Sequence, residues 1–419
     1  MKTIENPKPR FFYGWYVVLA CWLMIFLQYS VSFGLFFKPI LEEFNWDRTT
    51  LSAVQSAGLL AFAVASPFLG RLIDRVGPRI MIMISLACQI LSASLIGIAS
   101  TIWHLYFARF FYWITVLPSA QVLTNRWFSK MRGTAQGILS SAMPLGTLIL
   151  TPLTQFLILA WTWRLTMLFW ALIMLVVMVP LVFIIRNNPR DKGLFPDGRA
   201  PEDDAQIDVS TGNLSVSQPV DTGHTIKQAS GTRGFWMLLI SQFICGIGCG
   251  FMMTHVVIFA TDMGFSDMIG AVSLSIQGGF NLFGVLLLGY ISDKIARKNV
   301  LSITFLIRAA SFFVLIIFIL TGGSSLWIFY LAMALFGIGW FTTAPLTAGI
   351  AADLFGNLRM GTILGLTTSC HMLGMAVGSF AGGAIYDLTN SYLAFFLVQC
   401  PLELVAVVLV FIIRQKRMY

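Results

Sequence analysis

GRLIDRVGPR, at residues 70–79, returns as GYISDKIARK at residues 289–298. The aspartates of the two copies, Asp74 and Asp293, lie 219 residues apart in a chain of 419 residues. Each copy stands between two long apolar runs, and basic residues flank each aspartate. A repeat at this separation indicates that the two halves of the chain are related by parallel duplication.

The composition is that of a protein embedded in lipid. Hydrophobic residues make up 57% of the chain and charged residues only 11%, whereas a soluble protein carries roughly 25% charged residues. The apolar runs are about 20–25 residues long, which is the length an α-helix needs to cross ~30 Å of hydrocarbon. Strands of a membrane barrel would instead be runs of about 10 residues with alternating character. We therefore expect an all-α membrane protein.

The apolar runs predict twelve membrane-spanning helices in two groups of six. A stretch rich in Pro, Gly, Ser and Thr, with an acidic cluster at 202–204, separates the groups and is expected to be a flexible cytoplasmic linker. This divides the chain into an N-terminal six-helix bundle (1–186), the linker (187–234) and a C-terminal six-helix bundle (235–419). The expected spans are 13–37, 51–71, 79–100, 102–125, 134–157, 163–186, 235–261, 269–291, 299–320, 325–351, 360–386 and 391–414.

Basic residues predict the orientation. With the N-terminus inside, 22 of the 27 Lys and Arg residues fall in cytoplasmic segments, and three (Lys38, Arg48 and Arg164) fall in outer loops. Both termini are therefore expected to be cytoplasmic, in a bacterial cytoplasmic membrane. The net charge of +9 follows from this topology and does not indicate a nucleic-acid partner. No cleaved signal peptide is expected, because a full-length span follows the short polar N-terminus.

The duplicated loops resemble the Gly-x-x-x-Asp-Arg-x-Gly-Arg-Lys signature of the major facilitator superfamily. Pro78 departs from the signature in the first copy, and Ala296 departs from it in the second. The resemblance implies two six-helix bundles around a central site that opens to alternate sides of the membrane. It also implies a role in gating, rather than in substrate contact, for six residues: Asp74, Arg75, Arg79, Asp293, Lys294 and Arg297. The alternative is that these are ordinary turn residues.

Further motifs resemble one branch of that family, the bacterial monocarboxylate transporters and oxalate–formate antiporters. They occur along nearly the whole chain, at residues 12–18, 36–39, 125–133, 188–198 and 254–266. The resemblance implies that His255 and Asn281 line the substrate site. Two features of the branch are missing, since Val285 stands where an Arg usually grips the carboxylate and Val31 stands where animal members have a Lys.

Ionisable residues at membrane depth are costly, so each is a candidate for function. Arg109, in the fourth span, is the fixed cation expected to bind an anionic substrate, and the alternative is that it bonds carbonyl groups of a neighbouring span. His255 and His371 are candidates for binding substrate or carrying a proton. The alternative for each histidine is a hydrogen-bonded packing role.

Arg308 and Glu403 lie in spans nine and twelve, which are peripheral in this fold. Arg308 is nine residues from the cytoplasmic start of its span, and Glu403 is eleven residues from the cytoplasmic end of its own. At 1.5 Å per residue their depths differ by only about 3 Å. We therefore predict that they form a structural ion pair.

These features favour a secondary transporter over an enzyme, a channel or a receptor. The sequence contains no catalytic constellation, no cofactor is implied, and the six cysteines are expected to be buried thiols, all within apolar runs. The leading substrate class is a small organic anion, most plausibly a monocarboxylate, moved with a proton by a chain that acts as a monomer. The alternative is a neutral or amphipathic solute, including efflux, which Val285 and the aromatic-rich spans favour. Uniport and anion exchange also remain open.

Overall fold

The computed structural model describes residues 12–129, 131–198, 225–292, 294–356 and 360–413, and these are helical almost throughout. The all-α membrane fold predicted from the sequence is confirmed. Within the described residues, eleven helical segments are long and apolar enough to cross a membrane.

The N-terminal half contains the six spans expected there, several of them broken into consecutive helices. Its elements are α1 (Tyr13–Gln28), η1 (Tyr29–Val31), α2 (Phe33–Phe44), α3 (Arg48–Val76), α4 (Pro78–Gly97), α5 (Ile102–Tyr112), α6 (Leu117–Trp127), α7 (Arg132–Ser140), α8 (Ala142–Ala160), α9 (Trp163–Ile173), η2 (Met174–Met178) and α10 (Val179–Val182).

The C-terminal half has longer, more continuous helices. They are α12 (Arg233–Asp262), α13 (Asp267–Ser292), α14 (Arg297–Leu320), α15 (Leu326–Gly339), α16 (Thr343–Phe355), α17 (Met360–Thr389) and α18 (Leu393–Phe411). The described ends of the predicted flexible linker are themselves ordered, as η3 (Pro189–Lys192), η4 (Pro196–Gly198) and α11 (Ile226–Ser230). Local capping explains this, since Asn188 and Asp191 cap η3, while Thr225 and Gln228 cap α11.

The fourth span of each half is interrupted. Residues 113–116 separate α5 from α6, so neither 11-residue helix crosses the membrane alone. Together they supply the twelfth span, predicted at 102–125. Residues 340–342 separate α15 from α16 in the second half. Pro118 and Pro345 follow the two breaks, and proline lacks the N–H that a continuous helix would use there.

The first duplicated loop is shaped by its glycine and proline. Gly77 ends α3 with φ +87°, a conformation that side chains rarely adopt, and Pro78 opens α4. Proline suits the first position of a helix, because the N–H it lacks would have no helical partner there. The departure of Pro78 from the family signature is therefore compatible with the same tight turn.

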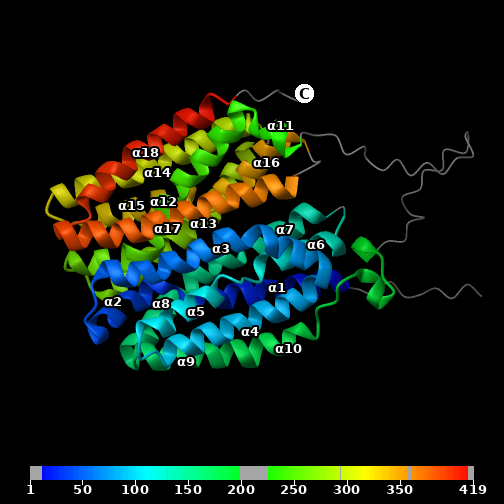
Figure 1. Ribbon diagram of the computed structural model, residues 1–419, viewed down its shortest axis with the longest axis horizontal. Coiled ribbons are helices and arrows are strands. Elements are labelled where there is room, and N and C mark those ends of the chain that lie inside the picture. Colours follow the sequence, from blue (N-terminus) through cyan, green and yellow to red (C-terminus); the bar gives the residue numbers. More distant parts are fainter. Residues whose placement is uncertain (1–11, 130, 199–224, 293, 357–359, 414–419) are drawn as a thin grey trace, which may run out of the picture.

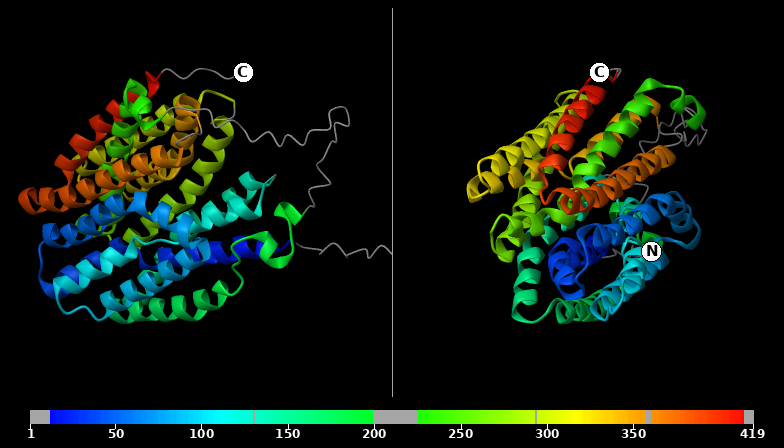
Figure 2. Two further views of the ribbon diagram at one scale, coloured as in Figure 1. Left: turned by 45° about the vertical axis from the view of Figure 1, so that its right-hand side comes forward. Right: turned by 60° about the vertical axis from the view of Figure 1, so that its left-hand side comes forward.

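The two halves lie side by side along their lengths, with α1, α4 and α9 of the first below α14, α17 and α18 of the second (Figure 1; Figure 2). Contacts between the halves pair α3 with α17, α8 with α13, and α2 with α12. We call the end that holds the α2–α3 and α12–α13 connections the Arg48 end, and the opposite end, which holds α11, the linker end.

Glycines bring α12 and α17 into close contact within the second half. A Cβ added to Gly374 would overlap the carbonyl oxygen of Phe243, and a Cβ added to Gly378 would overlap that of Ile247. The two backbones therefore touch, as small residues at four-residue spacing allow in membrane helices.

Candidate functional site

Arg109, on α5, is fully buried in the N-terminal half. Its Nη2 donates to Oε1 of Gln55 on α3. The guanidinium carbon lies 4.6 Å from the ring centre of Phe33 and 4.1 Å from that of Tyr112. Among the described residues, no carboxylate pairs with Arg109, and its one hydrogen bond goes to a side chain rather than to a backbone carbonyl.

Four buried N–H donors around Arg109 have no acceptor in the described part of the chain. They are Nε and Nη1 of Arg109, Nε2 of Gln55 and Nε1 of Trp113. A Cβ added to Gly58 would lie 2.9 Å from the carbonyl oxygen of Arg109 and 3.0 Å from Cδ1 of Trp113, so the two residues sit against the same point of α3. An unmet buried donor costs about 1–3 kcal/mol and is rare. We call Gln55, Arg109 and Trp113 the Arg109 site, and this set of donors with one positive charge suits an anion.

The break after α5 lies beside this site. The helix ends at Tyr112, and two side chains of α4 donate to the carbonyl groups that the break leaves without helical partners. Oγ of Ser85 lies 3.1 Å from the carbonyl oxygen of Thr115 and 2.8 Å from that of Met81, so the two carbonyl groups share its one proton. Nε2 of Gln89 donates to the carbonyl of Tyr112 (3.5 Å). Irregular backbone at membrane depth is tolerated where protein groups satisfy it, and broken helices often form transport sites.

The Arg109 site lies one residue from the contact between the halves. Ser56, next to Gln55, donates to the carbonyl of Ala376 on α17 at 2.8 Å. Gly34, next to Phe33, faces the carbonyl of Met253 on α12. A relative movement of the halves would therefore act directly on the walls of the site.

His255, predicted to line the substrate site, is buried in the contact between the halves near the Arg48 end. Its Nε2 lies 2.8 Å from the carbonyl oxygen of Ser379 and 3.3 Å from Oγ of Ser52. Its Nδ1 lies 3.2 Å from the hydroxyl of Tyr392. All of its polar partners are protein groups from α3, α17 and the start of α18.

His371 and Asn281 lie in other places. Nδ1 of His371, which is half-buried, lies 3.3 Å from the carbonyl oxygen of Gln242. Asn281 is buried and donates to the carbonyl of Gly337 at 3.1 Å, and its Oδ1 has no partner among the described residues. No hydrogen bond joins any two of Arg109, His255, Asn281 and His371 within the part of the chain described.

Charged residues that were not predicted as a site join the halves at the Arg48 end. Arg48 of α3 makes two hydrogen bonds to the carboxylate of Asp262 on α12 (2.6 and 2.7 Å) and one to the hydroxyl of Tyr392 (2.7 Å). The carboxylate of Asp387 on α17 accepts from the backbone N–H groups of Arg48 (3.3 Å) and Thr49 (2.7 Å), which caps α3 from the other half. We call Arg48, Asp262, Asp387 and Tyr392 the Arg48 latch.

A second ion pair supports the latch, since Lys38 on α2 lies 2.8 Å from Asp267 on α13. The sequence signal was present, because Lys38 and Arg48 are two of the three cations assigned to outer loops, and the aspartates flank C-terminal spans. Only the fold brings the two sets face to face.

Arg308 and Glu403 are brought together, both fully buried in the C-terminal half. Nη2 and Nε of Arg308 lie 2.8 and 3.2 Å from Oε1 of Glu403. Arg308 also donates to the carbonyl of Cys245 (2.8 Å) and to Sγ of Cys249 (3.2 Å). The geometry is that of the structural ion pair predicted from their equal depths.

The predicted gating residues that the structure describes occupy the linker end. Asp293 lies outside the described residues, and Asp74 is described only as a backbone position of α3. Arg297 makes a two-pronged ion pair with Asp353 on α16 (2.8 and 2.9 Å), and Nζ of Lys294 lies 4.3 Å from the ring centre of Tyr290. For the remaining two, Arg75 is exposed, and the backbone N–H of Arg79 donates to Asn187 at 3.0 Å.

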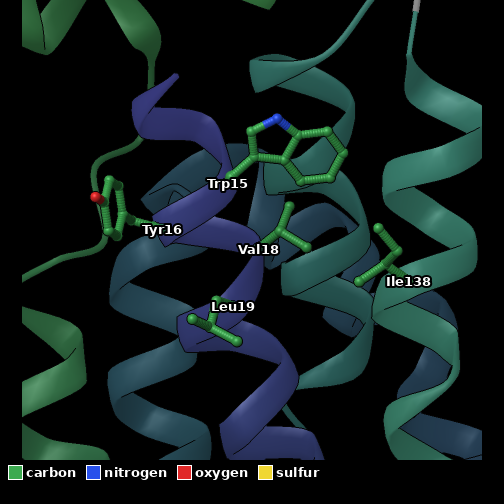
Figure 3. A pocket seen from close by; sticks show the side chains of 5 residues that line it. All are labelled: Trp15, Tyr16, Val18, Leu19 and Ile138. Atoms are coloured by element: carbon green, nitrogen blue, oxygen red, sulfur yellow. The ribbon is translucent and has the colours of Figure 1, made fainter. Parts of the chain in front are cut away.

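Two hollows on the described part of the chain do not include Arg109 among their lining residues. One, of about 380 Å³, lies between α1 and α7 and is lined by Trp15, Tyr16, Val18, Leu19 and Ile138 (Figure 3). These side chains are apolar or aromatic, and Leu19 is 60% exposed, as expected of a surface that faces lipid. The other, also about 380 Å³, lies on the Arg48 latch and includes Lys38, Glu42, Arg48 and Asp262.

Comparisons with known proteins agree with this architecture. The chain matches the family model described as Major Facilitator Superfamily over residues 17–379 and 282–418. It is 27% identical to the uncharacterized MFS-type transporter YcxA of Bacillus subtilis, over 93% of this chain and 91% of that protein. It is 26% identical to the oxalate:formate antiporter of Oxalobacter formigenes (88% and 84% covered).

More distant relatives extend the same pattern. The chain is 23% identical to monocarboxylate transporter 12 of Rattus norvegicus, covering 92% of this chain and 82% of that protein. Among solved structures, it resembles a bacterial homolog of the human lysosomal transporter Spinster, with a TM-score of 0.66, 16% identity, and 97% and 95% of the chains covered. The sequence match, the twelve helical spans and the shared fold agree, and the chain belongs to the Major Facilitator Superfamily as a membrane transporter.

Proposed function

We propose that this protein carries a small organic anion, most plausibly a monocarboxylate, and that the Arg109 site binds its carboxylate. The observation that carries the proposal is the buried guanidinium of Arg109, which has two unpaired N–H groups and no carboxylate partner in the described residues. A buried cation is ordinarily paired, because desolvating it alone costs several kcal/mol. A carboxylate substrate supplies the missing charge and acceptors.

The charges also favour one carboxylate over two. Arg109 is a single positive charge, and Arg308, the other fully buried arginine of the described residues, is neutralised by Glu403. A monoanion balances the Arg109 site, whereas a dianion would leave one negative charge buried. The relatives described as an oxalate:formate antiporter and a monocarboxylate transporter also support an acid as substrate.

We further propose that transport is coupled to a proton and proceeds by rocking of the two halves. The termini then face the cytoplasm, and the Arg48 end faces outward in a bacterial cytoplasmic membrane. This orientation rests on the excess of Lys and Arg at the linker end. The Arg48 latch joins the halves at the Arg48 end, and such a contact suits one state of an alternating-access cycle.

The test is uptake of labelled lactate, pyruvate, formate and oxalate into proteoliposomes, with and without an inward proton gradient. We expect saturable uptake of the monocarboxylates that rises with the gradient, and a loss of about 100-fold in Arg109→Gln, since charge-assisted hydrogen bonds to a buried anion are removed. Lys227→Gln, an exposed cation of α11, is the matched control and retains uptake.

A neutral or amphipathic solute is the second candidate, and the specific observation in its favour is Val285, which leaves α13 without the cation implied by the branch resemblance. Failure of all four acids to enter vesicles that contain well-folded protein would contradict the anion proposal. Neutral solutes and efflux substrates would then be tested in the same vesicles.

A further inference from the structure

We propose that His255 is the site at which a proton releases the Arg48 latch. In this inference, a second proton on the imidazole is incompatible with the closed contact and opens the Arg48 end. It rests on the proposed rocking of the halves, but not on the identity of the substrate.

The hydrogen bonds around His255 determine which ring nitrogen carries the proton. The carbonyl oxygen of Ser379 can only accept, so Nε2, at 2.8 Å, must donate to it. In a neutral imidazole the other nitrogen is then an acceptor, so the Tyr392 hydroxyl donates to Nδ1 at 3.2 Å. The closed contact is therefore matched to neutral His255 with its proton on Nε2.

The chain of donors continues from His255 to the latch. Because the Tyr392 hydroxyl donates to His255, its oxygen accepts from Nη1 of Arg48, at 2.7 Å. Arg48 in turn uses both terminal nitrogens on the carboxylate of Asp262. One unbroken series of hydrogen bonds thus runs from Asp262 through Arg48 and Tyr392 to His255 and Ser379, crossing between the halves.

If His255 bound a second proton, the groups packed around it would provide neither an acceptor for that proton nor an unengaged negative charge. On α3, His255 faces Ser52 and the cation Arg48. On α2, it faces the ring of Phe37, whose centre lies 5.2 Å from the centre of the imidazole ring. α17 contributes the Ser379 carbonyl, with Tyr386 and Asp387 farther along, and α18 begins at Tyr392. Asp262, on the same helix as His255, is engaged by both terminal nitrogens of Arg48, and Asp387 is engaged by the first turn of α3.

A proton on Nδ1 of His255 would point at the Tyr392 oxygen. In the closed state, the hydroxyl hydrogen of Tyr392 points at that same Nδ1. Tyr392 would have to turn its O–H away from its acceptor, and a second cation would then lie beside Tyr392, which already contacts the cation Arg48. Separation of the halves removes both problems, because His255 then reaches water. Binding of the proton therefore favours the state that is open at the Arg48 end.

Linkage sets the size of the effect. A solvated histidine has a pKa of about 6.5. If the closed state admits only the neutral form, the ratio of open to closed molecules rises about tenfold between pH 7.5 and pH 5.5. An ordinary histidine anywhere in the chain titrates in this range, so the comparison with His255→Gln is what assigns the pH response to His255.

The test uses spin labels on Glu42→Cys and Leu388→Cys, two exposed positions at the Arg48 end of opposite halves. The half-buried Cys88, Cys370 and Cys400 are replaced by Ala, and distances are measured by electron–electron double resonance in lipid nanodiscs without substrate. We expect a longer-distance population that grows about tenfold, relative to the shorter one, from pH 7.5 to pH 5.5. In His255→Gln, whose amide retains one donor and one acceptor, the distribution does not change with pH.

Two further variants make each outcome decisive. Asp262→Asn removes the anion of the latch and should lengthen the distance at both pH values, which shows that the labels report opening. Arg109→Gln lies outside the network and keeps the pH response even where transport is lost, so failure of the anion proposal is distinguishable from failure of this one. The inference is overturned if the distance distribution of the wild type does not change with pH while that of Asp262→Asn shifts to longer distances. It is also overturned if His255→Gln shows the same pH response as the wild type.

Discussion

In the part of the chain that the structure describes, each half buries one arginine beside its interrupted fourth span, and the two arginines are satisfied differently. Arg109 stands on α5 just before the break at 113–116, and Arg308 packs against Gly339, the last residue of α15 before the break at 340–342. Both guanidinium groups lie over aromatic rings, Tyr112 at 4.1 Å and Phe336 at 4.7 Å. Among the residues that the structure describes, only Arg308 of the two has a carboxylate, supplied by Glu403.

This difference indicates that Arg308 is a structural cation and that Arg109 is available to bind a ligand. Arg308 uses Nε and both terminal nitrogens on protein acceptors, whereas Arg109 uses one terminal nitrogen and leaves Nε and Nη1 without partners among the described residues. Each half thus has a similar buried position for an arginine, which we call the Arg109 seat and the Arg308 seat. In the described part of the chain, protein groups satisfy the guanidinium fully only in the Arg308 seat. We expect changes at the Arg308 seat to affect folding and changes at the Arg109 seat to affect transport.

The largest effect is expected from Glu403→Ala. It strands a fully buried guanidinium, and loss of one partner of a buried pair costs about 3–5 kcal/mol. The double variant Arg308→Met/Glu403→Leu removes both charges and should recover most of that loss. Thermal unfolding of purified protein in detergent measures both, and equal damage in the single and double variants would mean that the pair does not act as a unit.

The second prediction gives Arg109 a carboxylate partner within the protein, as Arg308 has. Gln55→Glu places a carboxylate where the amide oxygen now accepts from Arg109, so the guanidinium gains an internal counter-ion. We expect monocarboxylate uptake to fall about 100-fold, since the substrate must displace a tethered anion, while the melting temperature is unchanged or higher.

Gln55→Met, which removes the acceptor without adding charge, is the control and should lose far less uptake. If Gln55→Glu transports as well as the wild type, Arg109 does not bind the anion.

The sequence predicted much of this comparison and missed the part that depends on tertiary contacts. Apolar run lengths located the spans, eleven of which are long and apolar enough in the described residues to cross a membrane, because the membrane sets the length of a helix. Equal depth in two peripheral spans was enough to anticipate the pairing of Arg308 with Glu403. The break after Tyr112 was not predicted, since its carbonyl groups are satisfied by Ser85 and Gln89 of another helix.

The same limit applies to the candidate site. Arg109 was found from its charge at membrane depth, but Gln55 and Trp113 carry no such signal and became candidates only through their unmet donors. His255 and Asn281 came from the family resemblance, and their placement beside Ser379 and Gly337 follows from packing between helices far apart in the chain. The Arg48 latch requires three C-terminal elements to meet α3, which no local pattern specifies.

The smallest effect is expected from Trp113→Phe, which keeps the aromatic ring and removes only the indole N–H. If that unmet donor binds the substrate carboxylate alongside Arg109, its loss removes one hydrogen bond, worth about 1 kcal/mol. The KM for monocarboxylate uptake should then rise about fivefold, with little change in the maximal rate or the melting temperature. Trp103→Phe, at a position 68% exposed, is the matched control and should leave KM unchanged. A fall in melting temperature with an unaltered KM would instead make Trp113 a packing residue, and the Arg109 seat would then bind its anion through Gln55 and Arg109 alone.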